Sequence, residues 1–97
     1  MTDTEILVNR FIKLRYQLGV SMKDVSDASK VIAEQTNNSY HFIHDTQVCM
    51  MENKRRKPSL DVLARCFRAL GYKIAVIPIN AKVYYRREDE DEGHRIT

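Results

Sequence analysis

Residues 45–71 constrain the fold most, because two helical patterns flank a run of four cations there. The second pattern places Leu60, Leu63, Ala64, Phe67 and Leu70 on one face of an α-helix. The first predicts a helix from about residue 45 to 53, with Val48 and Met51 facing inward. Pro58 and Gly71 limit the second helix, which should start at Ser59. The cations 54–57 (KRRK) therefore occupy a turn between two amphipathic helices.

The first part of the chain predicts two more helices joined by a short turn. Residues 2–4 can cap the first helix, and its apolar face is Leu7, Phe11, Leu14 and Leu18. Arg10, Lys13, Arg15 and Gln17 should lie mostly off that face. Gly19 can end this helix, and Ser21 with Asp24 resembles a capping box that opens the next. The second helix has a small-residue stripe that lets another helix approach closely: Val25, Ala28, Ser29 and Ile32.

Two segments interrupt this helical pattern. We expect a loop or irregular insertion at residues 36–43, in which Tyr40, Phe42 and Ile43 either anchor the loop or extend the following helix. After Gly71 the apolar period changes to two, which predicts a strand over residues 72–79. A lone strand is unstable in water, so it should pair with residues 83–85 or with a second subunit. Residues 88–97 are too charged to bury, and we expect them to be disordered.

Charge is divided unevenly along the chain. Residues 1–87 carry fifteen Lys/Arg against eight Asp/Glu, whereas residues 88–97 carry five acids against one Arg. The basic part favours a polyanionic partner. We expect no membrane span and no secretory signal, because no long apolar run is present. Cys49 and Cys66 both fall in predicted helices, which favours free thiols in a reducing, cytoplasmic compartment.

The residues do not form a known catalytic or metal-binding pattern. His41, His44 and Cys49 fit no strong zinc spacing, and the chain has no CxxC pair. A glycine-rich phosphate loop, a nucleophile elbow and a convincing acid/base pair are all missing from the sequence. We therefore expect neither an enzyme nor a cofactor or metal. Tyr72, Tyr84 and Tyr85 suit strand or interface packing better than base stacking.

The order of these elements resembles the Cro/C1 (Xre) type of helix-turn-helix DNA-binding protein. The match covers about residues 6–71. It includes the first-helix signature Phe11, Leu14 and Arg15, the turn Gly19–Ser21, and the buried second-helix position Val25. The end of the recognition helix is matched by Val48, Glu52 and Asn53. The "P-S-L…L…A-L-G" pattern of the fourth helix is matched by Pro58–Leu60, Leu63 and Ala69–Gly71. Residues 72–79 are similar to the C-terminal strand of antitoxin-like members, which pairs across a dimer.

This resemblance implies a fold and a set of DNA contacts. The fold would be a four- to five-helix, lambda-repressor-like domain over residues 1–71. A strand or short hairpin over 72–87 would follow, and then the acidic tail 88–97. Base edges would meet the recognition helix through Asp45, Thr46, Gln47 and Met50. Phosphates would meet Ser21, Lys23, Lys54, Arg55 and Arg56. The dimer interface would contain Tyr72, Ile74, Val76 and Ile77.

Three features depart from the family pattern. Met22 replaces the glutamine that usually opens the second helix, and Lys54 replaces the glycine after "E-N". The gap before the recognition helix is about a dozen residues longer than usual, so residues 34–44 either add a contact or extend the scaffold.

The resemblance leads to a preferred function and two alternatives. The preferred function is a dimeric, sequence-specific repressor on a palindromic operator. One alternative is an antitoxin that neutralises a toxin protein and regulates its own operon. A weaker alternative is a scaffold that binds only protein, which is suggested by Met22 in place of the usual glutamine.

Overall fold

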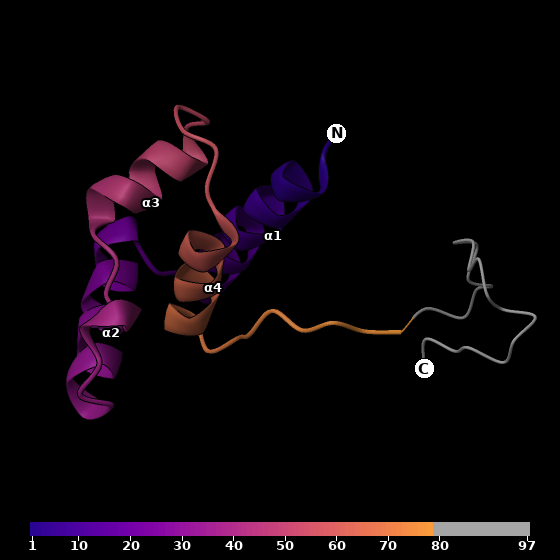
Figure 1. Cartoon of the computed structure of the whole chain (residues 1–97). Coiled ribbons are helices and arrows are strands. Elements are labelled where there is room, and N and C mark those ends of the chain that lie inside the picture. The colour runs from indigo at the N-terminus through magenta and orange to yellow at the C-terminus, as the bar shows by residue number, and fades with distance from the viewer. Residues whose placement is uncertain (79–97) are drawn as a thin grey trace, which may run out of the picture.

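A computed structural model of the chain describes residues 1–78 (Figure 1). These residues form four α-helices, α1 (Asp3–Leu18), α2 (Met22–Gln35), α3 (Asp45–Glu52) and α4 (Leu60–Ala69), and the short 3-10 helix η1 (Ser39–His41). Helix α2 packs against α3, α4 and η1, and α1 packs against α3 and α4. The predicted mainly helical class is therefore confirmed, with each predicted helix close to its expected position.

Side-chain caps fix where the first two helices begin. The Thr2 hydroxyl accepts from the Glu5 N–H at 3.2 Å, and the Glu5 carboxylate accepts from the Thr2 N–H at 3.0 Å. The predicted capping box of α2 is confirmed, because Ser21 and Asp24 exchange bonds of 2.8 and 3.0 Å. These bonds, led by the one from the Ser21 N–H, hold the pKa of the Asp24 carboxyl below its ordinary value. The backbone leaves α1 at Gly19 with φ of 70°, a conformation that suits glycine.

The core lies where α1, α3 and α4 meet α2. The Phe11 and Phe67 rings pack edge to face, 5.7 Å apart. The buried apolar residues are Val8, Phe11, Val25, Ile43, Val48, Met51, Leu63, Cys66 and Phe67. The predicted inward positions Val48 and Met51 are confirmed. Two predicted core residues were wrong, because Leu18 is 49% exposed and Leu60 is 64% exposed. Both lie at helix ends, beyond the reach of the facing helices.

Residues 36–44 form part of the scaffold. Helix η1 packs on α2, and Ile43 is completely buried, which makes it the anchor of this segment. Arg65 and Arg68 of α4 are half-buried and lie against this segment. The Arg65 guanidinium carbon lies 4.6 Å from the centre of the Tyr40 ring. One Arg68 guanidinium nitrogen lies 3.0 Å from Nδ1 of His41.

Helix α4 ends where the sequence predicted. Gly71 has φ of 91°, and the N–H groups of Gly71 and Tyr72 each bond a carbonyl of the last turn at 2.9 Å. Residues 72–78 then leave the helical body without regular secondary structure (Figure 1). The described residues contain no strand. Residue 79, the proposed partner residues 83–85 and the acidic tail 88–97 all lie outside the described part, so pairing of this segment stays a prediction.

Candidate nucleic-acid interface

Helix α3 is held by a buried ion pair at its C-terminal end. Nε and Nη2 of Arg15 on α1 each donate to a different carboxylate oxygen of Glu52, both at 2.7 Å. The two side chains are only 7% and 5% exposed, and Nη1 of Arg15 also donates to the Val20 carbonyl at 3.0 Å. The bond to Glu52 raises the pKa of Arg15 above its ordinary value. This pair fixes the distance between α1 and the end of α3.

The burial of Arg15 corrects the prediction that it lies off the packed face of α1. The buried residues of that helix are Val8, Phe11 and Arg15. Arg15 therefore continues the buried stripe, four residues after Phe11. Its charge suggested solvent exposure, but its spacing from Phe11 was a signal that could have placed it inward.

Most of the predicted base-contacting residues are accessible. Asp45 and Thr46 are exposed at the start of α3, and Met50 is 41% exposed one turn later. Neither Asp45 nor Thr46 is the N-cap of the helix. His44 is the N-cap residue, and its N–H donates to Oε1 of Gln47 at 3.0 Å. Gln47 is half-buried, and its carbonyl oxygen accepts one bond at the start of its own helix, which leaves its amide NH2 group and one lone pair of that oxygen for another partner.

The basic turn 54–57 follows α3 directly, and all four cations are exposed. Lys54 has φ of 62°, a left-handed conformation that glycine adopts more readily than lysine. The N–H groups of Lys54 and Arg55 donate to the carbonyls of Met51 and Met50 at 3.2 and 2.9 Å, which closes the helix. Nζ of Lys54 reaches Oδ1 of Asn9 on α1 at 3.0 Å. Within residues 1–78 none of these four cations forms an ion pair.

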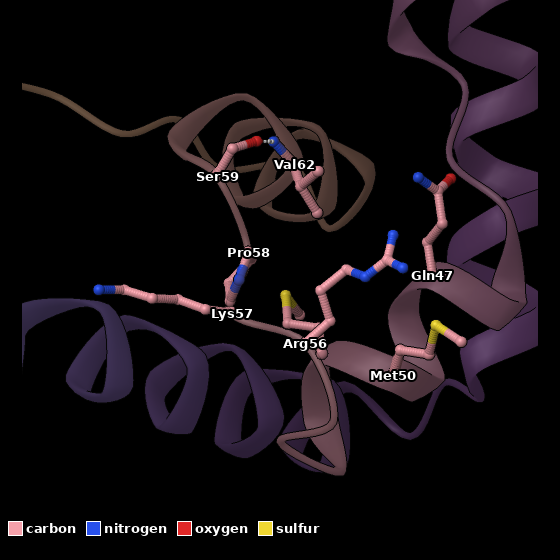
Figure 2. Close-up of a pocket in the computed structure, with 8 residues that line it drawn as sticks. Gln47, Met50, Arg56, Lys57, Pro58, Ser59 and Val62 are labelled. Atoms are coloured by element: carbon pink, nitrogen blue, oxygen red, sulfur yellow. Dashed lines mark hydrogen bonds between the residues drawn. The ribbon is translucent and has the colours of Figure 1, made fainter.

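A cavity of about 260 Å3 lies between α3, the basic turn and the first turn of α4. Figure 2 shows the Arg56 side chain extending between Gln47 and α4, whereas Lys57 points the other way. Met50, Met51 and Val62 supply apolar lining. The Ser59 hydroxyl accepts from the Val62 N–H at 3.2 Å, so it caps α4 at the cavity edge (Figure 2). The structure thus brings a predicted base reader and a predicted phosphate contact to one hollow.

The start of α2 offers a weaker anion site than the sequence suggested. Ser21 uses both its N–H and its hydroxyl within the capping box, and the Asp24 carboxylate lies at the same end. Nζ of Lys23 lies 3.6 Å from Asp27, in an exposed pair that adds little stability. A phosphate approaching here would be repelled by Asp24, so Lys23 is the more available of the two predicted contacts.

The described residues contain neither a metal cluster nor a membrane span. No group of three His, Cys, Asp or Glu side chains in residues 1–78 is placed to hold a metal ion. In the same part of the chain, every helix is too short or too polar to cross a bilayer. Cys49 and Cys66 are free thiols, and burial raises the pKa of Cys66 to about 12.

Comparisons with protein-family models, with characterised proteins and with solved structures found no significant match to this chain.

Proposed function

We propose that the protein is a sequence-specific DNA-binding transcriptional regulator. The observation that carries the proposal is the juxtaposition of an exposed helix face with an exposed, unpaired basic turn. Thr46 and Met50 are accessible on α3, and the turn 54–57 begins two residues after this helix ends. A helix of this size fits the major groove, and cations beside it can neutralise the flanking phosphates. The resemblance to Cro/C1 type proteins supports the same assignment.

The residues around α3 divide into two roles under this proposal. Thr46 can pack on a thymine methyl group, and Asp45 can accept from a cytosine amino group. Arg55 and Arg56 bind phosphates and set the register of the helix. Gln47 can donate to a base with its NH2 group while its carbonyl oxygen keeps the bond from the His44 N–H. A dimer would place two such helices about 34–36 Å apart on a palindromic operator.

The exposed apolar segment after Gly71 supports a dimer. Tyr72, Ile74 and Ile77 are exposed, and Val76 is completely so. Exposed apolar residues such as these are costly to leave in water, and a strand from a second copy would cover them. An antitoxin would use the same segment to bind a toxin protein, and this is the second candidate function. Co-purification distinguishes the two: capture of the product of a neighbouring gene supports the antitoxin, and a homodimer that has no partner and binds its operator fully supports the repressor.

The roles are tested by selecting binding sites from duplexes with 20 randomised base pairs. Thr46→Ala should relax base preference at one position in each half-site. Arg55→Ala should instead weaken all sequences alike and reduce the salt slope by about one. Gln47→Glu keeps an oxygen for the His44 N–H but removes the NH2 donor, so it should change base preference without loosening α3. Equal loss of specificity from Thr46→Ala and Arg55→Ala would contradict this division.

A further inference from the structure

The buried hydroxyl of Ser29 joins α2 to the segment that leads into α3. Ser29 is 1% exposed, and its Oγ accepts from the Ile43 N–H at 2.9 Å. The same oxygen lies 2.7 Å from the Ser26 carbonyl and 3.3 Å from the Ile43 carbonyl, so its single proton has a close acceptor. Ile43 itself is completely buried. Main chain and side chain at residue 43 are thus both fixed to the core.

This clamp sits directly before the recognition helix. Only His44 separates Ile43 from Asp45, the first residue of α3. At the other end of the helix, Glu52 is fixed to α1 by Arg15. Helix α3 is therefore held at both ends by buried polar contacts. A tight turn from α2 would set the direction of α3 by itself, but the nine residues between Gln35 and Asp45, including η1, cannot do so without such an anchor.

We propose that Ser29 is a positioning residue for base recognition, which aims the N-terminal end of α3 at the DNA. The inference rests on the proposed DNA-binding function. Without the hydroxyl, the Ile43 N–H loses its buried acceptor, and the main chain must shift to find another. A shift there moves Asp45 and Thr46, because they follow within three residues. The basic turn 54–57 lies beyond the Arg15–Glu52 pair and keeps its place, so phosphate binding persists while base selection weakens.

The test compares base selection by three variants with that of the wild type. Each protein selects from duplexes with 20 randomised base pairs, and its affinity for the wild-type consensus is divided by that for an unrelated duplex. Ser29→Ala should lower this ratio by about tenfold, which is the effect of about one mismatched base pair in the DNA site, and unrelated DNA should be bound as tightly as by the wild type. Ser29→Thr restores a hydroxyl and should recover much of the ratio. Ser26→Ala is the matched control, since Ser26 is also buried on α2 but uses only its carbonyl.

A merely structural role gives different results. Ser29→Ala would then lower the melting temperature but keep the wild-type ratio and consensus, and this outcome overturns the inference. If Ser29→Ala does not fold, Ser29→Cys replaces it, because sulfur keeps the shape and is a weaker acceptor. Hydrogen exchange of the wild-type Ile43 amide is a second check: protection is expected, and exchange at the rate of a free amide overturns the clamp. A wild type that selects no consensus would instead contradict the proposed function.

Discussion

Removing one partner of the Arg15–Glu52 pair should destabilise the fold severely. In Glu52→Ala, the guanidinium loses two bonds of 2.7 Å and stays in a site where its side chain is 7% exposed. Leaving a buried charge without its partner costs about 3–5 kcal/mol. A domain of this size has a free energy of unfolding of about 4–12 kcal/mol, so the variant loses a large part of its stability.

Urea unfolding followed by circular dichroism measures this loss. The slope for a small domain is about 1 kcal/mol per M or somewhat more, so the midpoint should fall by about 2–4 M. The matched control is Asp27→Ala, which breaks the exposed Lys23–Asp27 pair and should change stability by about 0.5 kcal/mol or less. The double variant Arg15→Met, Glu52→Leu leaves no buried charge and should recover most of the loss. A loss below about 1 kcal/mol for Glu52→Ala would contradict a buried ion pair, because exposed pairs contribute no more than that.

Three further changes have defined outcomes. Lys54→Gly should raise the free energy of unfolding by about 0.5–1 kcal/mol in urea melts, because glycine adopts φ of 62° without the side-chain penalty; an unchanged or lower value would contradict this. At pH 8, a thiol reagent should modify the half-buried Cys49 and leave Cys66, whose pKa is about 12, until the chain unfolds; equal rates in the native state would count against the buried thiol. The pKa of the Asp24 carboxyl is lower in the folded chain than in the unfolded chain. Its charge therefore stabilises the fold at any pH above the unfolded pKa of about 3.9. This contribution is lost as the pH falls through the lower pKa of the folded chain. The stability difference between wild type and Asp24→Asn should therefore be greatest near neutral pH and shrink in acid, and a difference independent of pH would exclude this carboxylate.

The helices could be predicted because their signals are local. The Ser21 and Asp24 capping box, the stop at Gly71 and the inward pair Val48 and Met51 each depend on residues within one or two turns. Buried positions follow from helical spacing, and helix ends follow from the unpaired backbone groups that need a cap. The errors at Leu18 and Leu60 come from helix ends, where a residue keeps the right spacing but has no facing helix.

The candidate site depends on contacts that are distant in sequence. Arg15 and Glu52 are 37 residues apart, and Ser29 and Ile43 are 14 apart. Spacing alone cannot show that a charged or small polar side chain finds a buried partner so far along the chain. The same limit applies to Gln47, because spacing alone does not show that its carbonyl oxygen accepts from the His44 N–H at the start of α3.

The proposed function requires that α3 reads a DNA sequence while the turn 54–57 binds the phosphate backbone. The most direct measurement is competition between the duplex that the wild type selects from a randomised pool and an unrelated duplex, at physiological salt. We predict that the selected duplex binds at least about a thousandfold more tightly. A ratio near one, with binding that disappears as salt rises, would mean that the basic turn binds polyanions without any sequence being read, and it would contradict the proposed function.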